Sequence, residues 1–566
     1  MKLKLLILNL PLLLSLTINA QGIGQYDEYG WTVLEPSADS RIVYVSSSEG
    51  DDNNDGLSES TPKETIAAGD ALIRDGFPDH LLLKRGDVFE NVTLGRWKSG
   101  RSLSEPLVVS YYGENGDRPL IIITEAFIRL AARPRNHVAV VGLEFYKPTS
   151  NPDSPSFDNT NSTHGISLSS GSSAENWLIE DCKFRYTWLA AQGNVQNGTG
   201  FLQNVFIRRN IISRGWVHNS TTTHQNRIQG LYVNDIENLY IEENFFDHCG
   251  WNDQIEDANA NQYNHNVYIQ TTCFGDIIFK GNILMRGAAH GVQLRSGGIA
   301  RHNVMINNAI GMNIGYNYAP AYNTEHTLVA DNVVTDGRPQ IPNDRTNPQT
   351  GALWGIWKQV IDNITVQDNI VANILDNRGG NIYPYRNYED NNANAHGEGN
   401  IAWNWERNDF PESNNYTDSD RNIASFATTK SLNGIDGYSN LHLNRPIKTY
   451  TFELSAYEYL NYIREGFNKA NDIVSDFTFT DNTTLDTDEE NIDQLDFFPN
   501  PVSNRININS NNTYKYYQIY NLYGIKVASG KMKNNRINVK RLTSGIYQLV
   551  VYESREVFIN KRFIKN

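Results

Sequence analysis

The chain has 566 residues, a formal net charge of −15 and three cysteines. So few cysteines argue against a fold held together by disulfides, and the negative charge argues against nucleic acid as a partner, because such a surface repels a polyanion at long range. The charge is uneven, since residues 494–566 carry twelve Lys and Arg against three acidic residues and the preceding residues carry −24.

The first element is a short apolar segment, residues 1–20. It starts with Lys2 and Lys4, continues through LLILNLPLLLSL and ends at Ala20. A basic start, a short apolar core and a small final residue are typical of a cleaved export signal. No later segment approaches the ~20 apolar residues of a transmembrane helix. We therefore expect a soluble, exported protein with no membrane span.

Residues 41–125 are predicted to close one end of a repetitive domain. TIAAGDALIRDGF (65–77) indicates a helix, which would cover the apolar side chains and strand edges at that end. The nearby acidic residues Asp51, Asp52 and Asp55 lack the full ligand spacing of a calcium loop. We favour a solvated turn there and predict no cofactor, with calcium left open.

Two families of short apolar runs then alternate along the chain. One reads IEENFF (241–246), FKGNIL (279–284), ARHNVM (300–305), VADNVV (329–334) and VQDNIV (366–371), and the other reads GLYVN (230–234), NVYIQ (266–270), GVQLR (291–295), GMNIG (311–315) and GIWKQ (355–359). The runs are too short for helices and are rich in β-branched and aromatic residues. Their recurrence predicts a solenoid of stacked coils, a parallel β-helix.

The first family carries an asparagine in every coil: Asn244, Asn282, Asn303, Asn332 and Asn369. We expect each to hydrogen-bond its counterpart one coil away and to adopt the left-handed backbone of the bend. Cys182 occupies the same position in IEDCKF, which favours a buried stacking residue. Cys249 and Cys273 are about one coil apart, so stacking or a disulfide between them stays open.

These repeats resemble the secreted right-handed parallel β-helix proteins, which include many polysaccharide lyases and glycoside hydrolases. The resemblance covers roughly residues 41–405, and we assign residues 21–480 to this domain with its N-terminal cap. It implies an all-β fold and a role in polysaccharide degradation, although one fold hosts many chemistries.

The second family defines the face on which we expect the site. One outward column holds Ser167, Tyr232, Tyr268, Gln293, Asn313 and Trp357, and the next holds Ser169, Asn234, Gln270, Arg295, Gly315 and Gln359. Amides and hydroxyls hydrogen-bond sugar hydroxyls, and aromatic faces stack on sugar rings. We predict substrate binding by Tyr232, Asn234, Gln270, Gln293, Asn313 and Trp357, with the glycines beside them allowing close approach.

Four residues on neighbouring coils could carry out β-elimination on a uronate. A cation neutralises the carboxylate, a base removes the C5 proton and an acid assists the leaving oxygen. His265, Tyr268, His290 and Arg295 supply these residue types and are the predicted catalytic residues. Strict alternation would turn both histidines inward unless the residue after each marks a bend. His302 precedes a ladder asparagine, where packing is the favoured role.

Two other functions stay open. Glycoside hydrolysis needs two carboxylates flanking the bond, which Asp253, Glu256 and Asp257 could supply from the loop before His265. No outward column carries an acidic residue, which favours elimination. A non-catalytic carbohydrate-binding or adhesin β-helix is the remaining alternative. No close His or Cys spacing supports a metal site.

The end of the chain changes character. Residues 406–480 are mixed, with a helix predicted at 455–470 over the final coil, and 481–493 indicate an acidic linker. Residues 494–566 contain FFPNPVSNRINI, YYQIYNLYGIKVASG and LTSGIYQLVVY, which resembles the C-terminal sorting domain of type IX secretion. The resemblance implies a small β-sandwich that binds the type IX machinery and directs the protein to the outer-membrane surface or the medium.

The sequence thus predicts a secreted, monomeric lyase. Its expected substrate is a uronate-containing polysaccharide, or its oligosaccharides, of the kind that algae produce, as the resemblance to secreted bacterial enzymes implies. If the substrate is acidic, the groove must be locally positive against the acidic background.

Overall fold

The structure is a computed structural model. It describes residues 23, 25–90, 92–95, 97–130, 134–169, 173–194, 200–218, 227–316, 326–335, 337–338, 353–361, 363–372, 382–387, 395–403, 414–416, 434–469, 473–479, 496–498, 502–509, 515–521, 526–533, 535–554 and 557–565. The predicted export signal and the acidic linker lie outside these residues.

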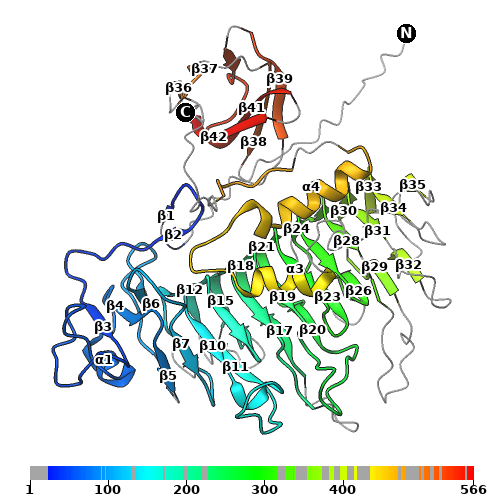
Figure 1. The fold of residues 1–566 in the computed structure, drawn as a ribbon. Coiled ribbons are helices and arrows are strands. Elements are labelled where there is room, and N and C mark those ends of the chain that lie inside the picture. The colour runs from blue at the N-terminus through cyan, green and yellow to red at the C-terminus, as the bar shows by residue number, and fades with distance from the viewer. Residues whose placement is uncertain are drawn as a thin grey trace, which may run out of the picture.

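Within the described residues, three parallel sheets run along the main domain (Figure 1). Sheet 1 consists of β8 (Ile128–Arg129), β11 (Thr163–Ser169), β14 (Thr187–Gln192), β17 (Gln229–Asn234), β20 (His265–Ile269), β23 (His290–Leu294), β26 (Ile310–Ile314), β29 (Leu353–Lys358) and β32 (Ile382–Asn387). Sheet 2 consists of β3 (Ile42–Val45), β4 (His80–Lys84), β6 (Leu107–Tyr112), β9 (Val138–Val141), β12 (Ala174–Glu180), β15 (Leu202–Arg208), β18 (Ile236–Glu242), β21 (Phe274–Lys280), β24 (Ile299–Arg301), β27 (Thr327–Ala330), β30 (Ile364–Gln367) and β33 (Ala395–Glu398). Sheet 3 consists of β5 (Val88–Glu90), β7 (Leu120–Ile122), β10 (Glu144–Tyr146), β13 (Lys183–Arg185), β16 (Ile211–Ser213), β19 (Phe245–Asp247), β22 (Ile283–Met285), β25 (Val304–Ile306), β28 (Val333–Thr335), β31 (Ile370–Ala372), β34 (Ile401–Trp403) and β35 (Asn414–Tyr416). The predicted parallel β-helix is confirmed.

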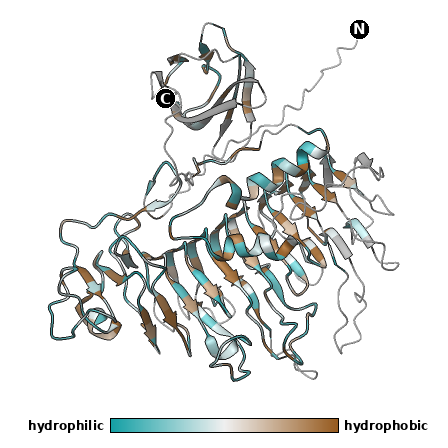
Figure 2. Ribbon diagram, viewed as in Figure 1, coloured by the Kyte–Doolittle hydropathy of each residue, from teal (hydrophilic) through white to brown (hydrophobic). Residues whose placement is uncertain are grey.

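The inward positions of all three sheets form one continuous core. In sheet 1, Leu231, Val267, Val292, Met312 and Ile356 follow one another in register and are fully buried. Figure 2 shows the hydrophobic residues concentrated on the strands, with polar residues on many of the turns. Each coil therefore buries its apolar face against the next coil, as a solenoid requires.

The asparagine ladder lies at the turn between sheets 2 and 3. In the middle of the ladder, Asn282 Nδ2 donates to Asn303 Oδ1 at 3.0 Å, and Asn303 Nδ2 donates to Asn332 Oδ1 at 2.9 Å. The same bonds link Asn210, Asn244, Asn369 and Asn400, and the Cys182 amide donates to Asn210. The predicted ladder is therefore present, with Cys182 buried at its start.

One detail of the ladder prediction is wrong. The left-handed residue is the one before each asparagine, such as Glu243 (φ 57°), His302 (φ 58°) and Asp331 (φ 54°). The asparagine itself faces inward, where its amide satisfies the backbone of two coils. His302 is buried and packs its ring 5.6 Å from that of Tyr457, which agrees with a packing role.

Helix α1 (Ile66–Leu72) lies at the N-terminal end of the solenoid (Figure 1). Thr65 caps it by accepting from the Ala68 amide, and Asp52 accepts from the Thr65 amide and hydroxyl. Ile66 and Gly69 are buried against the first coil. The predicted covering helix is present, and the Asp52 carboxylate is used to hold the turn before it.

The C-terminal segment of the main domain covers the outer face of sheet 3. That face is apolar from β16 onward, where Ile211, Phe245, Ile283, Val304, Val333, Ile370 and Ile401 stand in register. Helices α3 (Gly434–Leu443) and α4 (Ala456–Gly466), with the 3₁₀ turn η3 (Phe452–Leu454), bury this stripe (Figure 1). The helix predicted at 455–470 corresponds to α4. Its predicted position over the final coil is wrong, because the apolar stripe that it covers runs along the side of the solenoid.

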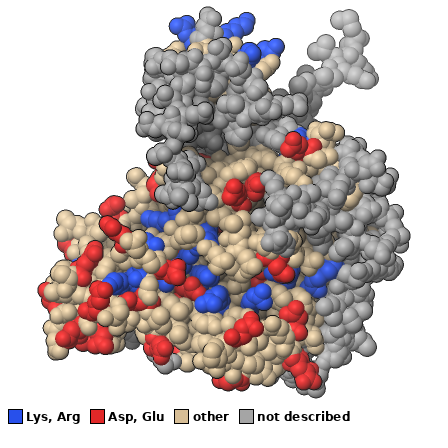
Figure 3. All heavy atoms as spheres, in the orientation of Figure 1, with Lys and Arg blue, Asp and Glu red and all other residues tan. Residues whose placement is uncertain are grey.

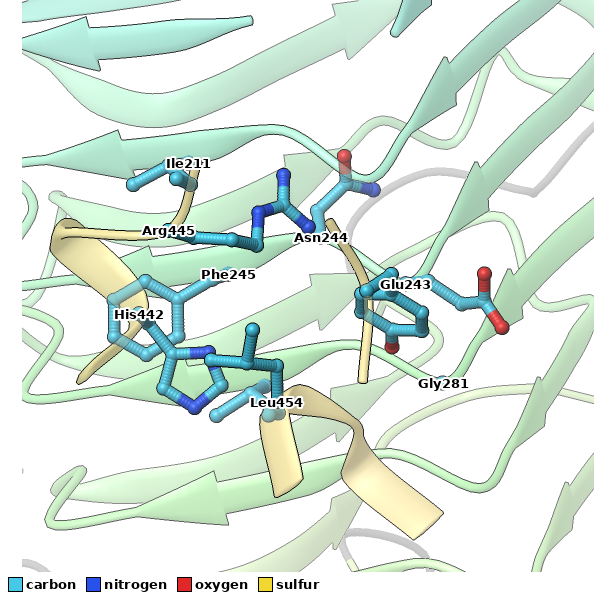
Figure 4. A pocket seen from close by; sticks show the side chains of 10 residues that line it. Ile211, Glu243, Asn244, Phe245, Gly281, His442, Arg445 and Leu454 are labelled. Carbon is cyan, nitrogen blue, oxygen red and sulfur yellow. The ribbon is translucent and has the colours of Figure 1, made fainter. Parts of the chain in front are cut away.

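The contact between this cover and sheet 3 is tight. Figure 4 shows the cavity between them, lined by residues that include Phe245, His442, Arg445 and Leu454. Its volume is about 10 Å³, which is room for about one water molecule. His442 stacks on Phe245 with ring centroids 4.3 Å apart. The cover therefore packs closely against the outer face of sheet 3 from β16 onward.

The cysteines do not pair. Cys249 lies at the turn from sheet 3 to sheet 1, whereas Cys273 lies at the turn from sheet 1 to sheet 2, and both thiols are free and buried. They stand at different corners, so the predicted stacking or disulfide between them is wrong. Sequence separation of one coil does not by itself place two residues at the same corner.

A strand pair, a short 3₁₀ helix and the C-terminal domain complete the described structure. Strands β1 (Gln25–Tyr26) and β2 (Thr32–Val33) form an antiparallel pair, and η1 (Pro148–Ser150) follows β10. The C-terminal domain has antiparallel strands β36 (Asp496–Phe498), β37 (Arg505–Asn509) and β40 (Arg536–Asn538) in one sheet and β39 (Lys526–Lys531), β38 (Tyr516–Asn521), β41 (Gly545–Ser554) and β42 (Val557–Lys565) in another. Its own apolar core confirms the predicted small β-sandwich.

Candidate active site

The outer face of sheet 1 carries the predicted column in register. Consecutive strands align Tyr232 with Tyr268, Tyr268 with Gln293, Gln293 with Asn313, and Asn313 with Trp357. The alignment missed one coil, because Ala190 of β14 stands between Ser167 and Tyr232. The segment TWLAAQ lacks the glycine of the other repeats, but its alternating Leu189 and Ala191 are buried and could have revealed it.

A break in alternation puts both predicted histidines on this outer face. A Cβ on Gly291 would meet the core residue Met305, and Val292 is also in the core, so two successive positions point inward. His290 and Gln293 on either side of them therefore face outward together. The glycine column faces the core, so the expectation that it would let a ligand approach closely is wrong.

The two histidines form a pair beside Tyr268. Their Nδ1 atoms are 2.8 Å apart, and the His265 ring lies 5.3 Å from that of Tyr268. Burial and the nearby Arg295 guanidinium lower the pKa of His290 to about 3, and burial, His290 and Arg295 hold the pKa of His265 well below its usual range. Both imidazoles are therefore neutral at pH 7, and one Nδ1 must donate to the other.

Arg295 supplies the positive charge of the cluster. Its guanidinium carbon lies 4.7 Å from the ring centroid of Tyr268 and 3.8 Å from that of Tyr316. Burial raises the pKa of Tyr268 despite the opposing effect of Arg295, so the phenol stays protonated at neutral pH. Tyr316 was not predicted, because it follows the last residue of its repeat.

Several buried polar atoms of the cluster lack a hydrogen-bond partner within the part of the chain that the structure describes. They are His290 Nε2, Gln293 Oε1, Arg295 Nε, Asn313 Oδ1 and Asn234 Oδ1. Leaving one such group unpaired costs about 1–3 kcal/mol, so each of these atoms calls for a partner such as a bound water molecule or a polar ligand.

The remaining predicted binding residues extend the cluster to both sides. Gln270 accepts from Arg295 at 3.4 Å and donates to the Tyr232 hydroxyl at 3.3 Å. These three side chains are half-buried and form the accessible edge of the site. Trp357 stacks at 6.3 Å from the His290 ring, and Arg386 in the next strand follows it in register.

Within the described residues, none of the three loop carboxylates contacts this cluster. The Asp253 side chain is 62% exposed, and its Oδ1 lies 3.8 Å from His248 Nε2. Glu256 and Asp257 are also exposed, and among the described contacts none joins them to the histidine pair. Their loop packs Ile255 against the neighbouring loop residue Trp216, so it forms a wall at the start of the sheet 1 strands.

No three His, Cys, Asp or Glu side chains among the described residues gather closely enough to bind a metal ion. In the same part of the chain, no helix has the length and hydropathy to cross a membrane. Figure 3 shows basic residues across the middle of the visible face of the main domain, with acidic residues among them and along its margins.

Comparison with solved structures gives distant similarity. Two structures of GH136 lacto-N-biosidase from Eubacterium ramulus, a selenomethionine derivative and the native protein, are similar to 67% of this chain over 68% of their own. The sequence identities are 14% and 12%, with TM-scores of 0.37 and 0.30, and similarity at this level says nothing about the reaction. No curated protein sequence matches the chain.

The C-terminal domain matches a known family. Residues 496–566 match the secretion system C-terminal sorting domain. This match confirms the predicted type IX sorting domain, and the protein is accordingly secreted or held at the cell surface.

Proposed function

We propose that the outer face of sheet 1 is the active site of a carbohydrate-active enzyme that cleaves a uronate-containing polysaccharide by β-elimination. The observation that carries this proposal is the group of unpartnered polar atoms beside the neutral histidine pair and Arg295. Amide, hydroxyl and aromatic groups in register along several coils suit a chain of sugar units, since amides bond hydroxyls and rings stack on sugars.

The first step needs a cation and a base. Arg295 binds the uronate carboxylate, which disperses the negative charge that develops when the C5–H bond breaks. A neutral imidazole of the histidine pair takes that proton, and the candidate atom is His290 Nε2, which has no hydrogen-bond partner within the described residues. The hydrogen bond to His265 fixes the tautomer and stabilises the imidazolium that forms.

The second step needs an acid. The electron pair from C5 forms the C4–C5 double bond as the bond from C4 to the leaving oxygen breaks. Tyr268, whose phenol stays protonated, donates its proton to that oxygen. The tyrosinate then recovers a proton from the histidine pair, whose nearer ring is 5.3 Å away. The net result is an unsaturated sugar and a free hydroxyl on the other fragment.

The test is ultraviolet absorbance of the full chain mixed with a panel of uronate polysaccharides and their oligomers. Elimination raises the absorbance, because the new double bond is conjugated to the carboxylate. New reducing ends without an absorbance rise would reject elimination and move the chemistry to carboxylates such as Asp253. Neither signal on any member of the panel would also reject the proposal and favour a binding protein.

Two variants connect the reaction to the site. His290→Ala and Arg295→Ala should each lower kcat/KM by at least ~10²-fold, the usual effect of a general base or a charge-stabilising group. The matched control is Arg85→Ala, because Arg85 bonds carbonyls of the turn at Gly116, at the end of a sheet 2 strand. Wild-type activity in both site variants would contradict the assigned roles.

A further inference from the structure

A polar hollow lies on the same face as the candidate site, toward the N-terminal end of sheet 1. Its volume is about 530 Å³, and it is lined by Glu125, Arg129, His164, Ser167 and Gln192 among others. These residues belong to or flank β8, β11 and β14, so none of them is part of the cluster around Tyr268.

The hollow and the cluster belong to one continuous column. Arg129 pairs in register with Ser167, Ser167 with Ala190, Ala190 with Tyr232, and Tyr232 with Tyr268. Coils in a β-helix are ~4.8 Å apart, so Ser167 lies ~14 Å and Arg129 ~19 Å along the solenoid from Tyr268. The column position between Ser167 and Tyr232 holds Ala190, which is buried.

The chemistry of the hollow suits an anionic sugar. Arg129 is exposed, and its guanidinium can bind a carboxylate through two parallel hydrogen bonds. His164 Nε2 is buried and has no partner within the described residues, and its ring stacks 3.7 Å from that of Trp188. Burial and Arg129 lower the pKa of His164 to about 4, so it offers a neutral hydrogen bond at pH 7. Ser167, Gln192 and Glu125 can bond sugar hydroxyls.

We propose that this hollow is an outer subsite that binds a further uronate unit of the same polysaccharide, with Arg129 on its carboxylate and His164 on a hydroxyl. The proposal rests on the proposed function, because it assumes that the substrate chain lies along sheet 1. A chain bound across both places spans several coils. The hollow therefore makes the enzyme select long chains over short ones without contributing to the chemical step.

The experiment compares a uronate polymer with a uronate trimer on the wild type, Arg129→Ala and Arg129→Lys. We expect Arg129→Ala to raise KM for the polymer about tenfold, the loss of ~1.4 kcal/mol, with kcat and all trimer values unchanged. Arg129→Lys should retain most of the polymer affinity, because the charge is kept. Equal losses on polymer and trimer, or no loss on either, would overturn the proposal.

A binding measurement separates this proposal from the proposed function. Calorimetric titration of the full chain with a long uronate oligomer should show binding that Arg129→Ala weakens, whether or not the chain is cleaved. Weakened binding without turnover would support the subsite and reject elimination. Absence of binding in the wild type would overturn the subsite. The matched control is Arg85→Ala, because Arg85 bonds carbonyls of the turn at Gly116, away from sheet 1. It should leave the affinity unchanged, and an equal loss in this control would also overturn the subsite.

Discussion

Burial decides which protons the side chains of the candidate site can carry. His290 is 2% exposed and Tyr268 is 5% exposed, and burial penalises whichever form is charged. It therefore keeps the imidazole neutral and the phenol protonated, so that a base and an acid coexist at one pH. Arg295 stays charged beside them because the pKa of a guanidinium is far above neutral even when burial lowers it.

The acid role of Tyr268 predicts a specific loss in the Tyr268→Phe variant. The ring should remain under Arg295, so KM should change little, while kcat falls by ~10²–10⁴-fold because the proton donor is gone. Steady-state kinetics on a uronate polymer measures both values. If the variant keeps its kcat, or if only KM rises, Tyr268 binds substrate and another group donates the proton.

At the scale of the element, the asparagine ladder depends on hydrogen bonds that are all buried. Asn303 accepts from the backbone and side-chain amides of Asn282 and donates to the Phe279 carbonyl and to Asn332, all at 2.8–3.0 Å. Every one of these groups is buried, so none can turn to water. One side chain thus satisfies the polar groups of three coils.

Replacing Asn303 with Ala should therefore destabilise the protein by more than an ordinary lost hydrogen bond. At ~1–3 kcal/mol for each buried group left unpaired, we expect at least ~3 kcal/mol. Urea unfolding followed by circular dichroism measures the change. The matched control is Asn440→Ala, since Asn440 is exposed on α3 and Ala is the better helix former. Equal stability of the two variants would contradict the role of the ladder.

At the scale of the whole molecule, buried histidines couple stability to pH. Eight described histidines have a lowered pKa, mainly because of burial: His80, His137, His164, His248, His265, His290, His302 and His442. Their unfolded pKa is ~6.5. Below that pH the histidines bind protons in the unfolded chain but stay neutral in the folded chain. The free energy of unfolding therefore falls as the pH falls from ~6.5 toward 4.

We expect the free energy of unfolding to fall by about 1.4 kcal/mol at pH 5.5 for each fully buried histidine. Urea titrations at about pH 7.5, 6.5 and 5.5 measure this loss. These pH values lie about one unit above, at and about one unit below the unfolded pKa of histidine. His442→Phe keeps the ring that stacks on Phe245 and removes one titrating group. It should therefore reduce the total loss between about pH 7.5 and 5.5 by about 1.4 kcal/mol, and an unchanged loss would contradict the prediction.

Much of the fold could be predicted because the residues that contact one another in a solenoid recur at a short period in the sequence. The recurring Asn244, Asn282 and Asn303 indicated the ladder, and the alternating runs indicated which side chains share the outer face of sheet 1. In a stacked coil each residue meets its counterpart one repeat away, so the register follows from aligning the repeats. The sorting domain carried its own motifs and could be recognised without any structure.

Only the tertiary structure decided which residues lie at the turns between sheets and which segments cover the outer faces of the sheets. The repeat pattern does not indicate that α4 packs along the apolar stripe of sheet 3, because the stripe and the helix are far apart in sequence. The direction of His290 depended on two successive inward residues at one bend, and the unequal turn lengths put Cys249 and Cys273 at different corners. Burial of the histidine pair, which sets its charge, follows from packing in three dimensions and has no counterpart in the spacing of residues along the chain.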